Sequence, residues 1–258
     1  MNELMTDLTN DSITVILPCA GEGRRLGLNS PKELFEIFPD TRLIDFSLRH
    51  IRDYADHIQT PNHLSVAVVI RPWKTDVTEY VISQLPGISV KPVMFDDRYT
   101  EWPGSVFSAH PLFSTYNIVL LPDSFLEVTG DEILLTSMIT ALKHHRVVFG
   151  CQDCTDEDKL RSLGAMRVEN GQVTVFQDKP RHSLDQFNGF WGCYGFQKEY
   201  GQILYNFLID SVHHQPQELT RQPFFPPAAI PISCYYDLGT WDNIQRFKAL
   251  AFGDQKTF

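Results

Sequence analysis

Two glycines and two basic residues stand close together near the start of the chain. Gly21 and Gly23 follow a short apolar segment, and Arg25 and Lys32 come shortly after them. Neighbouring glycines let the backbone turn sharply and bring its N–H groups close to a ligand. Because fixed positive charge lies beside those amides, the segment predicts a binding site for phosphate groups.

Two common phosphate loops do not fit this segment. A dinucleotide-binding fingerprint requires a third glycine at position 26, where the chain has Leu26. A P-loop ends in Gly-Lys-Ser or Gly-Lys-Thr, which this segment lacks. A solvated glycine-rich turn with exposed basic residues is the alternative that these residues leave open.

The composition indicates a globular protein that does not bind polyanions broadly. The 258 residues are 43% apolar and 21% charged, and their net charge of −10 argues against a nucleic-acid or anionic-lipid partner. No apolar stretch approaches the roughly 20 residues of a membrane helix, and the polar, acidic N-terminus does not resemble a signal peptide. Five scattered cysteines indicate reduced thiols, so we expect a cytoplasmic protein.

Short apolar segments alternate with helical patterns over the first 150 residues. The pattern predicts strands over 13–18, 64–70, 89–95, 117–121 and 147–150. It predicts helices over 43–57, 76–85, 105–113 and 131–145. This rhythm is typical of an α/β fold, a Rossmann-like three-layer α/β/α sandwich with a mostly parallel central sheet.

The pattern changes after about residue 150. Strands are predicted over 165–168, 173–177, 190–195 and 233–238, helices over 199–212 and 241–251, and a Pro-rich loop over 216–231. We therefore expect one domain over residues 1–258, with a nucleotide-binding half to about residue 150 and a smaller substrate half over 151–258.

Four motifs in chain order resemble those of the sugar-1-phosphate nucleotidyltransferases, also called nucleotide-sugar pyrophosphorylases. Residues 17–34 are similar to the Gly-x-Gly-x-Arg-Leu signature and the Pro-Lys that follows it. Segments 120–123, 176–180 and 236–240 resemble the segment with the metal-binding Asp, the Glu-Lys-Pro motif and the Asp-x-Gly-Thr motif. The spellings at 31–34 and 121–123 look most like bacterial UTP–glucose-1-phosphate uridylyltransferases.

The resemblance implies a fold of the nucleotide-diphospho-sugar transferase type and a Mg²⁺-dependent reaction. A sugar 1-phosphate, glucose 1-phosphate first, would attack the α-phosphate of an NTP, UTP first, and release pyrophosphate. Catalysis would fall to Arg25, Lys32 and Lys179, and metal binding to Asp123 and Asp237. The nucleotide would contact Ala20, Gly21, Gly23, Gly104 and Ser105. The sugar phosphate would contact Gly164, Asp178, Lys179 and Asn188. Members of the family are often homo-oligomers.

Other interpretations stay open. The chain would also suit a dTTP- or CTP-using enzyme that acts on another sugar phosphate or phospho-alcohol, a glycosyltransferase of related fold, or a non-catalytic sugar-nucleotide regulator. Among single residues, Asp123 and Asp237 also suit turn or helix-cap positions, and Gly104 a helix start. The sequence departs from the family at Asp178, where Glu is usual, and at Arg24, where Ser or Thr is usual.

Overall fold

The first strands form a parallel group. A computed structural model describes residues 11–58, 63–213 and 217–253. In it, β1 (Ile13–Pro18) pairs in parallel with β4 (Leu64–Ile70) and β6 (Tyr116–Leu120), and β5 (Ser89–Met94) extends the sheet beyond β4. β1, β4 and β6 are apolar along most of their length because both of their faces are buried.

The sheet continues through strands of the second half, and most of these are antiparallel. β11 (Gly189–Gln197) lies antiparallel between β6 and β8 (Val147–Asp153). Beyond them lie β9 (Gly164–Glu169), β10 (Gln172–Asp178), β12 (Gln217–Glu218) and β13 (Ala228–Pro231). The prediction of a mostly parallel sheet is therefore wrong, and the sheet is mixed. The turn at Asn170–Gly171, with both φ angles positive, reverses the chain within two residues, which only antiparallel neighbours allow.

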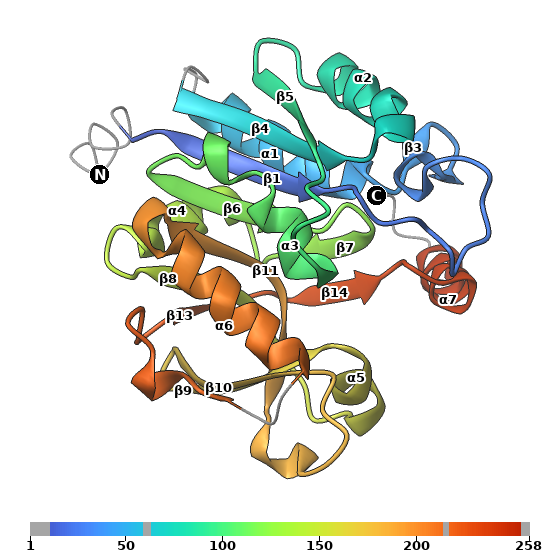
Figure 1. Cartoon of the computed structure of the whole chain (residues 1–258). Coiled ribbons are helices and arrows are strands. Elements are labelled where there is room, and N and C mark those ends of the chain that lie inside the picture. Colours follow the sequence, from blue (N-terminus) through green and yellow to red (C-terminus); the bar gives the residue numbers. More distant parts are fainter. Residues whose placement is uncertain (1–10, 59–62, 214–216, 254–258) are drawn as a thin grey trace.

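Helices cover both faces of the sheet, as the three-layer prediction requires. α1 (Asp45–Ile58), α2 (Thr75–Gln84) and α4 (Leu134–Leu142) pack into one apolar core with β1 and β4. α3 (Glu101–Phe107) and α6 (Gly201–His213) pack on the other face, in front of the sheet in Figure 1. Within the described ranges, no helix has the length and apolar character needed to cross a membrane.

A small second sheet joins three distant parts of the chain. β7 (Ser124–Glu127) pairs antiparallel with β14 (Cys234–Asp237), and α7 (Trp241–Gly253) follows directly. Their apolar side chains share a core with Leu26 of the glycine loop. This packing brings the glycine loop, the end of β6 and the start of α7 together, although the sequence separates them by more than 200 residues.

The remaining elements are short. β2 (Glu36–Phe38) and β3 (Thr41–Arg42) form a hairpin, and α5 (Glu157–Ser162) begins at Asp156, whose carboxylate accepts from the Asp158 and Lys159 backbone N–H groups. The expected Pro-rich loop contains β12 and β13, which sequence patterns did not indicate. The expected helices over 105–113 and 131–145 begin at Glu101 and Leu134 instead.

Candidate active site

The glycine loop after β1 presents a run of backbone N–H groups that no described residue accepts. From Ala20 to Arg25 none of these donors has a hydrogen-bond partner among the described residues. Gly23 adopts a positive φ of 68°, which favours glycine, and its carbonyl accepts from the Leu26 N–H at 3.0 Å. A loop of unpaired amides beside cations is an anion-binding arrangement, as the sequence predicts.

The carbonyl groups of this loop are held from behind by two cations. Lys74 Nζ donates to the carbonyls of Cys19 and Gly21 at 2.8 and 2.6 Å, and Arg71 Nε donates to the Ala20 carbonyl at 3.1 Å. Three consecutive carbonyl groups of the loop therefore accept hydrogen bonds from the segment between β4 and α2. These hydrogen bonds use the acceptor groups of the loop and leave its N–H groups for a ligand.

A buried ion pair fixes Lys74 itself. Lys74 Nζ lies 2.9 and 2.8 Å from the two carboxylate oxygens of Glu33, and both residues are almost fully buried. Burial raises the pKa of the Glu33 carboxyl, with Lys74 opposing that rise. The sequence did not reveal this pair. The two residues are 41 positions apart, and each taken alone is a charged residue of the kind usually found at the surface.

Two predicted carboxylates meet two predicted cations at the end of β6. Lys32 Nζ forms an ion pair with Asp123 Oδ2, and the two side chains are only 14% and 16% exposed. Asp237 lies beside Asp123 because β14 pairs with β7, where Asp237 is opposite Ser124. The Leu238 N–H also donates to the Asp123 carbonyl at 2.8 Å.

The geometry around Gly239 shows how closely these groups converge. A Cβ atom at Gly239 would lie 2.9 Å from Asp237 Oδ1 and 3.2 Å from Asp123 Oδ2. The same position would lie 2.8 Å from Arg25 Nη2. Any larger residue would therefore collide with three charged groups, which explains the glycine in the Asp-Leu-Gly-Thr segment. The structure brings Arg25, Lys32, Asp123 and Asp237 together, and their catalytic and metal-binding roles stay predictions.

The surroundings of Asp123 and Asp237 shift the pKa values of the two carboxyl groups in opposite directions. Burial acts to raise the pKa of the Asp123 carboxyl, but Lys32 and then Arg25 outweigh it and hold that pKa below its usual range. Burial and the neighbouring Asp123 charge raise the pKa of Asp237, although the Gly239 N–H at 2.8 Å partly offsets them. Asp123 is thus held ionised by the protein, whereas Asp237 would gain from an added cation.

Two carboxylates fit Mg²⁺, but they do not complete a metal site alone. Among the described residues, no group of three or more Asp, Glu, His or Cys side chains is arranged to hold a metal ion. Mg²⁺ in nucleotide enzymes takes one or two protein carboxylates and completes its shell with phosphate oxygens and water. The donor set of Asp123 and Asp237 fits this description, so Mg²⁺ would be held with the substrate.

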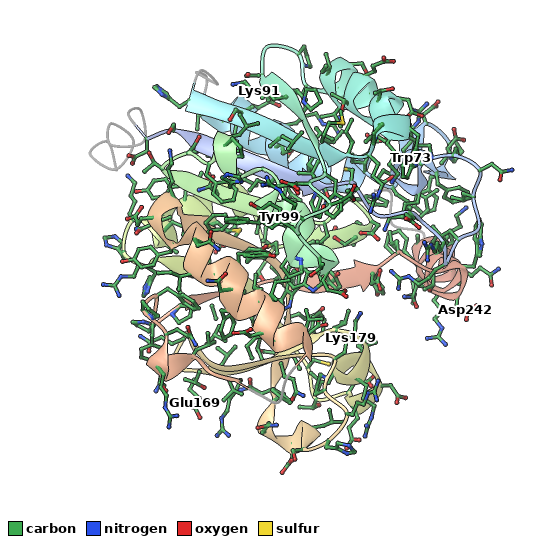
Figure 2. The ribbon with its side chains drawn as sticks, viewed as in Figure 1. Trp73, Lys91, Tyr99, Glu169, Lys179 and Asp242 are labelled. Carbon is green, nitrogen blue, oxygen red and sulfur yellow. The ribbon has the colours of Figure 1, made fainter. Side chains whose placement is uncertain are left out.

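Lys179 approaches from the opposite side of the site. It follows β10 with a positive φ of 47°, and its side chain is exposed. Figure 2 shows Lys179 at the upper edge of the region formed by β9, β10 and α5, the edge that faces α3 and β14. It joins no ion pair in the described chain. Its predicted role toward an acceptor phosphate stays a prediction.

Three other predicted contacts are placed in settings that argue against them. The Asn188 amide is occupied by the Val168 backbone, donating at 2.9 Å and accepting at 2.8 Å, so it fastens β9. Gly164 lies under the Trp191 indole, whose Nε1 is 1.9 Å from the position of an added Cβ, so the indole covers this face of Gly164. A Cβ at Gly104 would lie 2.8 Å from Tyr99 Cβ, so Tyr99 covers Gly104.

Ser105 stays a nucleotide-binding prediction with one supporting feature. Its side chain is buried, and its hydroxyl has no hydrogen-bond partner in the structure. Sequence reasoning also left out the pairing of Trp102 with Trp191, whose ring centroids lie 5.0 Å apart. The aromatic pattern of β11 indicated packing, but not that one indole would cover the strand beside Asp178.

Comparison with known proteins gives the fold. No protein-family model matches the chain, and no curated protein matches it by sequence. An apo UDP-glucose pyrophosphorylase structure is similar with a TM-score of 0.72 and 15% identity, over 95% of this chain and all of that one.

Two further solved structures are similar. One is described as a glucose-1-phosphate thymidylyltransferase from Bacillus anthracis, with a TM-score of 0.69 and 15% identity over 96% of this chain and 97% of that one. The other is the inositol-1-phosphate CTP transferase from T. maritima, with a TM-score of 0.63 and 16% identity over 94% and 97%. The chain therefore has the fold of the sugar-1-phosphate nucleotidyltransferases over nearly its whole length.

Proposed function

We propose that the protein transfers a nucleoside monophosphate from an NTP to the phosphate of a sugar 1-phosphate or a similar phosphate monoester. The observation that carries this proposal is the convergence of Arg25, Lys32, Asp123 and Asp237 beside a loop of unpaired amides. Such a set of fixed charges suits a reaction between two anions. Charge neutralisation and positioning supply most of the rate in phosphoryl-group chemistry of this kind.

The bond changes balance without an activated protein nucleophile. An oxygen of the acceptor phosphate forms a bond to the α-phosphorus of the NTP. The bond from that phosphorus to the oxygen bridging the α- and β-phosphates breaks, and pyrophosphate leaves with the electron pair. The acceptor oxygen is already an anion, so no side chain has to remove a proton.

Each residue of the chain then has a separate task. The loop amides and Arg25 bind the triphosphate, and Arg25 in addition neutralises charge on the departing pyrophosphate. Lys32 holds Asp123 ionised and in place through their ion pair. Lys179 attracts the acceptor phosphate from the other side. Mg²⁺, held by Asp123 and Asp237 with the phosphates, would supply Lewis-acid stabilisation of the phosphate charge.

The substrates within this class are inferred less directly. UTP and glucose 1-phosphate are the first expectation, on the motif spelling and on the likeness to UDP-glucose pyrophosphorylases. Similar structures also include a thymidylyltransferase and a CTP transferase, so dTTP and CTP belong in every test.

Pyrophosphate release provides the test. Five NTPs are each combined with Mg²⁺ and a panel of phosphate monoesters, and release is measured by a coupled assay. We expect release to require both substrates and to fall at least 100-fold in Arg25→Ala, while Arg167→Ala, at an exposed arginine of β9 that pairs with Glu169, serves as the control. Hydrolysis of NTP at the same rate without any acceptor would contradict the proposal.

A further inference from the structure

A row of side chains crosses three strands of the second half on one face of the sheet. In β9, Gly164 is opposite Asp178 of β10, and the register of β9 with β11 places Trp191 on the other side of Gly164. Directly opposite residues share a face, so Asp178 and Trp191 project to the same side. The Trp191 indole occupies the space where Gly164 has no side chain, with its Nε1 1.9 Å from the position of an added Cβ.

A second aromatic ring and a second carboxylate come to this row from α3. Trp102 packs against Trp191 with centroids 5.0 Å apart, and Trp102 itself is only half-buried. Glu101 precedes it with a φ of 58°, a conformation that non-glycine residues rarely adopt. Burial raises the pKa of the Asp178 carboxyl, the neighbouring Lys179 charge opposes that rise, and the Glu101 charge adds to it.

The polar groups of this cluster form no hydrogen bond or ion pair within the described chain, and the nearest opposite charge to act on Asp178 is that of Lys179. Neither the Asp178 nor the Glu101 carboxylate forms an ion pair there. The indole Nε1 of Trp191, a residue only 7% exposed, has no acceptor. A buried donor without an acceptor is unfavourable, so the Trp191 N–H is a group that a ligand could complete, whereas Glu101 is exposed and Asp178 is half-buried.

The row belongs to the acceptor side of the site. Cys193 pairs with Leu120, so Trp191 lies just beyond the end of β6, the end that leads to Asp123. Lys179 adjoins Asp178 and would hold a phosphate there. Once a phosphate engages Lys179, a neutral sugar would give the carboxylates hydroxyl donors but no countercharge in its place. A cation would offset both charges and is also attracted to the faces of indole rings.

We propose that the acceptor is a phosphate monoester that carries a positively charged amine or quaternary ammonium group. Its phosphate lies near Lys179 and its cation lies between Asp178, Glu101 and the Trp102–Trp191 pair, while an oxygen of the ester accepts from Trp191 Nε1. This inference rests on the proposed function for the transfer step, but the binding of the cation does not depend on turnover.

Matched pairs of acceptors separate charge from shape. Phosphocholine is compared with its neutral carbon isostere 3,3-dimethylbutyl phosphate, and glucosamine 1-phosphate with glucose 1-phosphate. Binding is followed by tryptophan fluorescence and turnover by pyrophosphate release with each NTP. We expect the charged member of at least one pair to bind, and to be used, at least tenfold better than the neutral one. A preference for phosphocholine would indicate an amino alcohol phosphate as the acceptor. A preference for glucosamine 1-phosphate would indicate an amino sugar phosphate.

Variants test whether the named carboxylates cause the preference. Asp178→Asn and Glu101→Gln should each reduce the charged-to-neutral ratio at least threefold. Trp191→Phe, which keeps a ring but removes the N–H, should weaken both members of a pair and keep their ratio. Glu199→Gln, an exposed carboxylate beyond the opposite end of β11, should leave the ratio as it is.

The outcomes distinguish this inference from the proposed function. Equal binding and use of charged and neutral esters, or a ratio that Asp178→Asn and Glu101→Gln do not change, would overturn the inference while pyrophosphate release leaves the transfer reaction intact. A charge preference in binding without pyrophosphate release from any pair would support the cation site and contradict the proposed reaction.

Discussion

The site has two sides that differ in how their polar groups are paired. The glycine-loop side is the loop after β1 with Lys74 and Glu33, and the acceptor side is the cluster of Asp178, Glu101, Trp102 and Trp191. Behind the loop, Lys74 makes four hydrogen bonds and Glu33 is enclosed with it. On the acceptor side, neither Asp178 nor the Trp191 Nε1 forms a hydrogen bond or ion pair with a described side chain, and only the Lys179 charge opposes that of Asp178. The glycine-loop side is therefore held by internal contacts, and on the proposed function the acceptor side would gain its contacts from the ligand.

This contrast suits the chemistry of the two substrates. Every NTP presents the same triphosphate, so a fixed loop and fixed charges serve whichever base is used, without the cost of rearrangement. The acceptor is the variable partner, and unpaired groups discriminate strongly because a wrong ligand leaves them unpaired. Substitutions on one side or the other should have different effects, and the largest is expected for the buried ion pair.

Removing one partner of the buried pair should damage the loop side most. We expect Lys74→Met to lower the free energy of unfolding by about 3–5 kcal/mol, since Glu33 would be left charged and buried. Urea unfolding measures this loss. Lys198→Met, at an exposed lysine, is the control. The double variant Lys74→Met/Glu33→Leu should be more stable than Lys74→Met, and equal or lower stability would show that the pair is not the cause.

Asp123 should matter for the reaction more than for the fold. We expect Asp123→Asn to lower kcat/KM by about 100- to 1,000-fold, because it removes a metal ligand and the partner of Lys32. The same change should shift the Mg²⁺ dependence of pyrophosphate release to higher concentration. Asp185→Asn, an exposed carboxylate of the second half, controls for the loss of charge. An Asp123→Asn enzyme within tenfold of the unchanged one would contradict this role.

The buried His50 of α1 should make the stability of the protein depend on pH. Its Nε2 lies 3.1 Å from the Leu126 carbonyl of β7, and burial, followed by Arg49, lowers its pKa to about 4. The unfolded chain, with an ordinary histidine pKa of about 6.5, binds the proton first. Protonation therefore favours unfolding as the pH falls from about 6.5 towards 4.

The expected size is measurable. Between pH 7 and pH 5 this group should remove about 2 kcal/mol from the free energy of unfolding. His50→Gln, which keeps a hydrogen-bond donor, should lose correspondingly less over the same range in urea titrations. Parallel pH profiles for the two proteins would show that His50 is not excluded from water.

Lys179 should give the smallest effect and the most selective one. Lys179→Met should raise the KM for the acceptor about tenfold, in line with one charge-assisted hydrogen bond, and leave the KM for the NTP within twofold. Steady-state kinetics with each substrate varied in turn separates the two constants. A rise in the KM for the NTP alone would contradict this role and indicate that Lys179 contacts the triphosphate.

The sequence predicts the loop side better than the acceptor side, for physical reasons. β1, β4 and β6 are continuous apolar segments, and the polar residues at their ends therefore stand out. The convergence of Asp123 with Asp237 could be expected from the motifs, and the pairing of β7 with β14 produces it. β7 itself is only four residues long and gives no pattern of its own.

The acceptor side depends on contacts that spacing does not reveal. Gly164 and Asn188 were expected to face the sugar, but one lies under an indole and the other closes a strand pair. On the loop side, the pair that spacing does not reveal is Lys74 with Glu33, which lie 41 residues apart. The mixed sheet arises because β11 inserts between β6 and β8, a crossover that no local signal indicates.

Phosphorus NMR of the reaction products tests the central claim most directly. The protein is incubated with Mg²⁺, one NTP and the phosphate monoester that gives the fastest pyrophosphate release. We expect free pyrophosphate and a new diphosphate whose two phosphorus nuclei couple to one another, one from the α-phosphate and one from the acceptor. Orthophosphate or nucleoside monophosphate as the product, with the acceptor unchanged, would contradict the account.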